Sequence, residues 1–146
     1  MNMNKLIDII FICSSVIFNI SVSTLYIATK LGNMVVVQVC GGVVISLIVP
    51  FTITLLGYLR EKAKKRTIIS HAFILFYLSL ELLLDYILKI PFREILAIHV
   101  AYIIVFYAAL FSMIGVSFEK NKKMGSVVIV TFLILMGCLI YYLLPI

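Results

Sequence analysis

Five long apolar runs, separated by short polar or charged breaks, constrain the fold of this chain more than any other feature. A helix needs about 20 mostly apolar residues to cross the hydrocarbon core of a bilayer. The 146 residues are 64% hydrophobic and only 12% charged, with a mean hydropathy of +1.25. A soluble domain of this size could not hide that much apolar surface from water. The sequence therefore predicts a chain whose main solvent is lipid.

The breaks between the runs set the boundaries of the expected helices. A polar turn at 30–33 follows the first run, and a basic connector at 60–66 follows the second. Pro91 ends the third run because proline cannot continue a helix, and a charged stretch at 119–123 separates the last two. We therefore expect a single all-α transmembrane domain over residues 1–146, an integral membrane bundle with five helices at 6–29, 34–59, 67–88, 95–118 and 127–144.

The distribution of lysine and arginine predicts the orientation of these helices. The connector at 60–66 carries five basic residues and that at 119–123 carries three, whereas the breaks at 30–33 and 89–94 carry one and two. Connectors rich in lysine and arginine stay in the cytoplasm. We therefore expect a multi-pass protein of the cell membrane, with the N-terminus cytoplasmic and the C-terminus extracytoplasmic. The net charge of +6 comes mainly from these connectors, so it does not indicate nucleic-acid binding.

Two carboxylates, Glu81 and Asp85, lie inside the third expected helix. A charged carboxylate at membrane depth costs on the order of 2.5–3.5 kcal/mol on insertion scales. Residues four apart share a face of an α-helix, so we expect both side chains to point the same way. Such a coupled pair suits a cation site, a proton relay or acid–base chemistry. For Asp85 an ion pair with Lys89 at the membrane interface is an alternative.

Other polar residues are expected at the same depth. With a rise of about 1.5 Å per residue, a short hairpin places Glu81 level with Tyr102 and Asp85 level with His99. His99 and Tyr102 are three residues apart and therefore share a helix face. Asn19 and Gln38, from the first two helices, reach the same half of the bilayer, although Asn19 could instead link two helices by a hydrogen bond. We expect a polar cavity open to the outer leaflet, with these substrate-binding residues: Glu81, Asp85, His99, Tyr102, Asn19 and Gln38.

Several kinds of chemistry find no support in the sequence. It contains no phosphate-binding glycine loop, nucleophile elbow or dinucleotide-binding fingerprint. The cysteines (Cys13, Cys40 and Cys138) are single residues within apolar runs, so neither a disulfide framework nor a CxxC site is expected. Glu81, Asp85 and His99 would suffice as three ligands for a metal ion, but no HExxH or paired-histidine spacing accompanies them. We expect no metal and no cofactor.

These observations predict a protein that binds and translocates a small solute, a cation or a protonatable amphiphile, through the outer-leaflet cavity. Two alternatives remain open. One is an intramembrane enzyme acting on a lipid or quinone-like substrate, so enzymatic activity is not decided at this point. The other is a non-catalytic subunit of a membrane complex. The expected partners are membrane lipids and the small-molecule or ion ligand, with a homo-oligomer as a further option and no nucleic acid.

Overall fold

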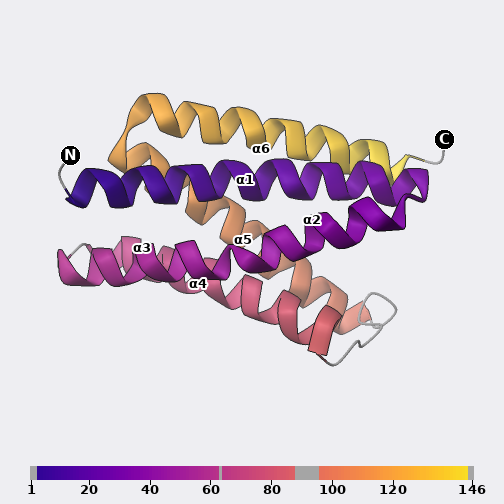
Figure 1. Ribbon diagram of the computed structural model, residues 1–146, viewed down its shortest axis with the longest axis horizontal. Coiled ribbons are helices and arrows are strands. Elements are labelled where there is room, and N and C mark those ends of the chain that lie inside the picture. Colours follow the sequence, from indigo (N-terminus) through magenta and orange to yellow (C-terminus); the bar gives the residue numbers. More distant parts are fainter. Residues whose placement is uncertain (1–2, 63, 88–95, 145–146) are drawn as a thin grey trace.

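The computed structural model describes residues 3–62, 64–87 and 96–144, and within these ranges it describes only the backbone at residues 3, 4 and 85–87. The described part is helical apart from short turns and contains no strand (Figure 1). It holds five helices that are long and apolar enough to cross a membrane, at Lys5–Leu31, Met34–Arg60, Lys65–Leu84, Leu96–Lys120 and Lys122–Leu143. The predicted all-α architecture with five apolar helices is confirmed.

The first helix packs against four of the others. In chain order they are α1 (Met3–Leu31), α2 (Met34–Ser46), α3 (Ile48–Arg60), α4 (Lys65–Glu81), the π-helix η1 (Leu82–Ile87), α5 (Leu96–Lys120) and α6 (Lys122–Leu143). Helix α1 packs against α2, α3, α5 and α6, while α3 packs on α4, α4 on α5 and α5 on α6. Helix α5 crosses the bundle obliquely and thereby joins α4 to α6 (Figure 1).

The two ends of the bundle differ in charge. The N-terminus, the connection from α3 to α4 and the turn from α5 to α6 lie together at one end, on the left of Figure 1. We call this the basic end, because most of the 12 lysines and arginines belong to these segments. The far end holds the α1–α2 turn, η1 and the end of α6. The two basic connectors on which the predicted orientation rests thus share one end.

The second span is bent near its middle. Leu47 separates α2 from α3, three residues before Pro50. Pro50 has no N–H, so the carbonyl of Ser46 loses the donor that an α-helix would supply. The Leu47 N–H lies 3.2 Å from the carbonyl oxygens of both Val43 and Val44, which tightens the turn before the proline. The two halves consequently form one bent span (Figure 1).

The prediction of a polar connector at 119–123 is wrong. Helix α5 continues to Lys120 and α6 begins at Lys122, well before the predicted start at residue 127. Asn121 alone separates them, and its Oδ1 accepts hydrogen bonds from the backbone N–H groups of Lys123 at 3.0 Å and Met124 at 3.3 Å. The long lysine side chains can extend beyond the apolar region from helical positions, so their charge does not require a loop.

The opposite turn, between α1 and α2, depends on a left-handed glycine. Gly32 has φ +77°, and the next N–H, of Asn33, donates to the carbonyl of Ala28 at 2.9 Å. In this common pattern, a left-handed glycine just past a helix lets the following N–H groups donate to the last carbonyl groups of that helix. Asn33 then caps α2 by accepting from the N–H of Val36 at 3.3 Å.

Apolar side chains both fill the bundle and cover its outside. The fully buried core is rich in aromatic and aliphatic groups, among them Phe11, Phe18, Phe51, Ile74, Leu78, Leu110 and Leu135. Large apolar side chains also cover the surface, for example Val35 at 71% and Leu56 at 61% exposure. An apolar exterior on helices of this length is what a lipid environment favours.

Candidate functional site

The carboxylate of Glu81 lies at the end of a hydrogen-bonded chain of tyrosines. The Tyr102 hydroxyl, on α5, donates to Oε2 of Glu81, on α4. The Tyr77 hydroxyl, one turn before Glu81, lies 2.9 Å from the Tyr102 hydroxyl. A tyrosine has only one hydroxyl proton, so when Tyr102 donates to Glu81 it must accept from Tyr77. We call Tyr77, Tyr102 and Glu81 the tyrosine chain; it confirms the predicted placement of Glu81 beside Tyr102.

The tyrosine chain runs outward from the aromatic core. Tyr77 is only 3% exposed, whereas Tyr102 and Glu81 are half-buried. The Tyr77 ring packs edge-on against Phe18, with centroids 5.8 Å apart, and tilts against Phe106 at 5.2 Å. A tyrosine buried among such rings needs a partner for its hydroxyl, and Tyr102 supplies it. The tyrosine chain thus links the buried Tyr77, which packs in the aromatic core, to the half-buried carboxylate of Glu81.

His99 lies on the first turn of α5 and is half-buried. Its Nδ1 is buried and has no hydrogen-bond partner among the described residues. The predicted partner, Asp85, lies in η1, and its side chain falls outside the described part of the structure, as does Lys89. The pairings of Asp85 with His99 or Lys89 therefore stay predictions.

The backbone after Glu81 differs from the predicted α-helix. Residues 82–87 form the π-helix η1, in which hydrogen bonds join each residue to the fifth one along. Residues four apart also lie close to one face of a π-helix, but the Asp85 side chain falls outside the described part of the structure. The prediction that the two side chains point the same way stays a prediction, although the backbone here is π-helical rather than α-helical. Single π-helical turns of this kind are frequent at functional sites.

Two other predicted site residues have different surroundings. Asn19, on α1, is 1% exposed, and its Nδ2 donates to Thr131 Oγ1 at 2.9 Å and to the Val128 carbonyl at 3.4 Å, both on α6. Asn19 thus links two helices, the alternative considered for it. Gln38 is exposed on the surface of α2. Neither residue forms a described hydrogen bond to the tyrosine chain.

A second polar cluster lies toward the basic end, and the sequence did not reveal it. His71, on α4, is fully buried; its Nε2 lies 3.1 Å from Thr54 Oγ1 and its Nδ1 2.9 Å from the Thr67 carbonyl. The neighbouring Tyr58 is also fully buried, and its hydroxyl donates to Asp8 Oδ1 at 2.6 Å. The cluster joins α1, α3 and α4, so it ties together the helices of this end.

Position in the sequence could not have revealed this cluster. Asp8, Tyr58 and His71 come from three helices, and no spacing along the chain relates them. The only available signal was that each interrupts an apolar helix near the same end of its span. Its rings also pack against one another: the His71 centroid lies 5.2 Å from that of Tyr58, in an edge-on contact, and 4.9 Å from that of Phe11, in a tilted contact.

We expect Tyr58→Phe to lower the free energy of unfolding by about 1.5–3 kcal/mol, because it removes the donor to a carboxylate without changing the packing of the ring. Thermal unfolding of the detergent-solubilised protein, followed by circular dichroism, measures the effect. Tyr142→Phe is a suitable control, since that side chain is 38% exposed and donates no described hydrogen bond. Equal midpoints for the two variants would contradict a stabilising Asp8–Tyr58 pair.

The chemistry that the described site can offer is one of charge and hydrogen bonding. Among the side chains that the structure describes, which do not include Asp85, no three histidine, cysteine or acidic groups gather closely enough to hold a metal ion. No protein-family model, curated protein or solved structure matches this chain. The function must therefore be inferred from the geometry around Glu81.

Proposed function

We propose that this is a multi-pass protein of the cell membrane, with its basic end in the cytoplasm, that binds a small cation or protonatable amphiphile at Glu81 and translocates it. The observation that supports the proposal is the tyrosine chain. It provides Glu81 with an oriented donor although the residue belongs to a membrane-spanning helix. Ionisable residues in such helices are costly and typically mark ion or substrate pathways.

The tyrosine chain suits a carboxyl group that exchanges a proton for a cation. An ionised Glu81 accepts from Tyr102 and carries the negative charge that attracts a cation. A protonated Glu81 carries an O–H that can itself donate to Tyr102, so the hydrogen-bond direction can reverse. Binding of the cation would then release the Glu81 proton to water, which couples uptake of the cation to release of the proton.

A dry layer separates Glu81 from the basic end. Along α4 the fully buried Ile74 and Leu78 lie between Glu81 and the buried His71. A solute at Glu81 would need this layer to rearrange before it could reach the cytoplasmic side. The bent span α2–α3, which packs on α4, offers an element able to move.

The proposal predicts that Tyr102→Phe slows uptake without unfolding the protein. Loss of the hydroxyl leaves Glu81 without its described donor, and one charge-assisted hydrogen bond is worth about 1.5–3 kcal/mol, or roughly tenfold or more in affinity. We would measure uptake of radiolabelled tetraphenylphosphonium, a lipophilic cation, by proteoliposomes, together with proton efflux reported by an enclosed pH dye.

Tyr107→Phe is the matched control for Tyr102→Phe. It removes a hydroxyl from the same helix, where the only described partner is the Met136 sulfur at 3.9 Å, a weak acceptor. We expect this variant to keep wild-type uptake. If vesicles with wild-type protein took up neither tetraphenylphosphonium, potassium nor protons faster than protein-free vesicles, the proposal of translocation would be contradicted.

A second candidate, the non-catalytic subunit, is favoured by Gln38. Its amide is exposed on α2 beside the exposed Val35 and Val39, where lipid could not satisfy it. A partner helix could. In that case the native protein would co-purify with a second chain in fixed stoichiometry. Gln38→Leu would release that second chain. A wild-type protein that purifies alone and is active in vesicles would exclude the role of a subunit.

A further inference from the structure

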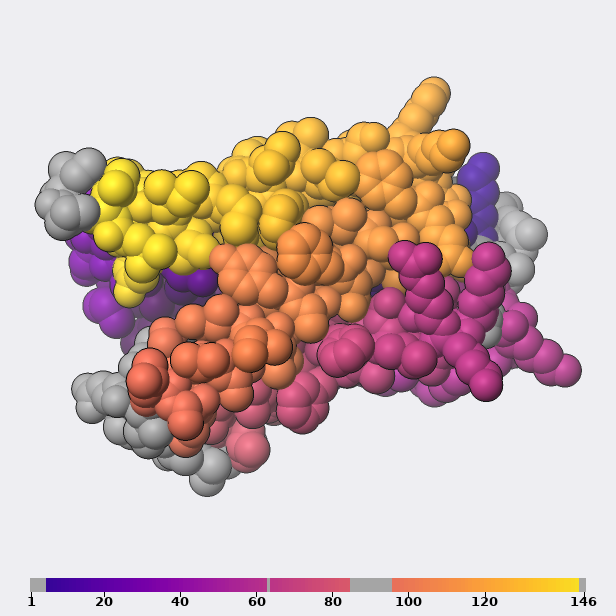
Figure 2. All heavy atoms as spheres, turned by 180° about the vertical axis from the view of Figure 1, so that it is seen from behind, coloured from indigo at the N-terminus to yellow at the C-terminus, as the bar shows by residue number. Residues whose placement is uncertain are grey.

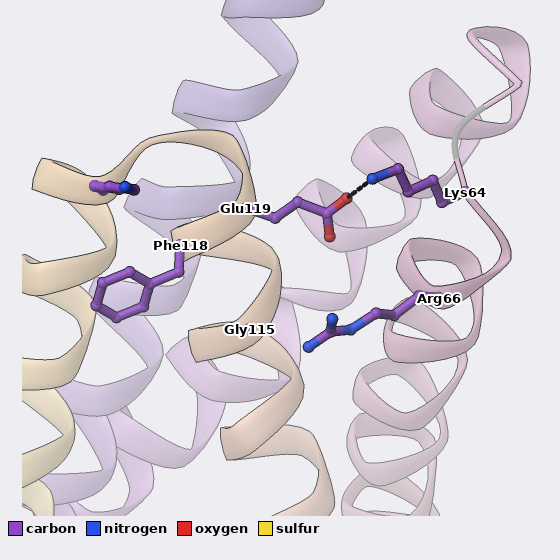
Figure 3. Close-up of a pocket in the computed structure, with 6 residues that line it drawn as sticks. Lys64, Arg66, Gly115, Phe118 and Glu119 are labelled. Carbon is purple, nitrogen blue, oxygen red and sulfur yellow. Dashed lines mark ion pairs between the residues drawn. The ribbon is translucent and has the colours of Figure 1, made fainter.

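A pocket of about 420 Å³ lies at the basic end, where α4 begins and α5 turns into α6 (Figure 3). It is distant from Glu81 along α4 and belongs to the opposite end of the bundle. Its walls are formed by Lys64, Arg66, Gly115, Phe118, Glu119 and Lys122. Three of these residues are cationic and one is acidic, so the pocket carries a net positive charge.

The single carboxylate of the pocket is already engaged. Lys64 Nζ lies 3.6 Å from Glu119 Oε1, with Lys64 79% and Glu119 25% exposed at the side chain (Figure 3). The Arg66 guanidinium points across the pocket toward α5 and forms no described hydrogen bond or ion pair. Arg66 and Lys122 therefore leave two positive charges without a described counterion. Such a pair of cations favours an anionic ligand.

Gly115 leaves room for the guanidinium of Arg66. A Cβ built at Gly115 would lie 3.7 Å from the nearer guanidinium nitrogen, so a larger side chain would extend into the space that Arg66 faces. Phe118, three residues further along α5, gives the pocket an apolar wall beside its charges. The pocket thus combines a cationic side with an apolar side at the end of three spans.

We propose that this pocket binds the phosphate group of an anionic phospholipid. Guanidinium and ammonium groups are the usual protein partners of phosphate, and arginine can bind two of its oxygens at once. Basic pockets between transmembrane helices on the cytoplasmic side are suited to anionic headgroups. The apolar wall at Phe118 favours a lipid over free phosphate, which offers the same anionic oxygens without an acyl chain. The proposal does not depend on the role of Glu81.

The experiment uses the full chain in nanodiscs that contain equal amounts of phosphatidylglycerol and phosphatidylcholine. Retained lipid is counted by native mass spectrometry after extraction into detergent. We compare the double variant Arg66→Gln/Lys122→Gln with Lys65→Gln/Lys123→Gln, which makes the same charge change one residue away on the same helices and outside the pocket wall. The pocket variant should retain phosphatidylglycerol at least about tenfold less than this control.

A third variant tests the space inside the pocket without changing its charges. Gly115→Val narrows the space without altering any charge and should likewise reduce retained phosphatidylglycerol, while circular dichroism checks that the protein stays folded. The proposal is overturned if the wild type shows no preference for phosphatidylglycerol, or if both double variants lose it equally, since either result would indicate diffuse surface attraction. Displacement of the lipid by millimolar inorganic phosphate would assign the site to free phosphate and equally overturn it.

Discussion

Replacing Glu81 by glutamine should abolish uptake of tetraphenylphosphonium by proteoliposomes while leaving the protein folded. The glutamine has nearly the same shape, and its amide oxygen can still accept from Tyr102, so the tyrosine chain can persist. The charge that attracts the cation is lost. Removing one partner of a buried charge interaction costs about 2–5 kcal/mol, which corresponds to cation binding weaker by roughly 30-fold or more. Equilibrium binding of radiolabelled tetraphenylphosphonium to the purified protein measures this directly.

Glu119→Gln is the matched control for this experiment. It makes the same chemical change at the basic end, where the described partner of the carboxylate is the exposed Lys64, in an ion pair worth about 0–1 kcal/mol. Uptake should therefore stay near the wild-type rate. An equal loss of uptake in both variants would show that overall charge, rather than the position of Glu81, controls the activity.

The second large effect is on stability: Gly125→Ala should destabilise the α5–α6 hairpin by about 1–3 kcal/mol or more, the range found when a packed site is overfilled. A Cβ at Gly125 would lie 2.8 Å from the Phe118 Cα and 2.9 Å from its backbone nitrogen. Backbone atoms cannot step aside as the tip of a side chain can, so the two helices would have to separate at their turn. Figure 2 shows how closely α5 and α6 pack in this region, at the upper right.

Gly137→Ala, in the same helix, provides the comparison. No atom lies within 4 Å of a Cβ at this position, so alanine meets no obstacle there. Because alanine favours a helix over glycine by up to about 1 kcal/mol, this variant should unfold at the same temperature or higher. Thermal unfolding in detergent, followed by circular dichroism, compares the pair, and similar midpoints for both variants would contradict the close contact at Gly125.

Those parts of the structure that depend on length and hydropathy could be predicted from the sequence. Five apolar runs long enough to cross a bilayer became five apolar helices, because lipid leaves the backbone few other ways to satisfy its hydrogen bonds. The pairing of Glu81 with Tyr102 could also be predicted, since a short hairpin between antiparallel helices determines which residues lie at the same depth.

Features that depend on how each helix is rotated, or on local packing, could not be predicted. Asn19 faces α6 rather than Glu81, and periodicity within a uniformly apolar helix does not specify that rotation. The π-helix after Glu81 has no composition that distinguishes it from an α-helix. The Asp8–Tyr58 pair required two helices to be placed first. Charge at 119–123 indicated a loop, whereas a single asparagine cap was enough to join the two helices.

The central claim, that Glu81 faces a hydrated site within the bundle, is tested most directly by thiol labelling. In a protein whose three native cysteines are replaced, Glu81→Cys and Leu83→Cys are exposed in turn to a membrane-impermeant maleimide. Leu83 lies two residues further along and is 43% exposed on the outside, where lipid would keep its thiol protonated and unreactive. We expect rapid labelling at position 81 and little labelling at position 83. Labelling at position 81 that is as slow as at position 83 would contradict the account.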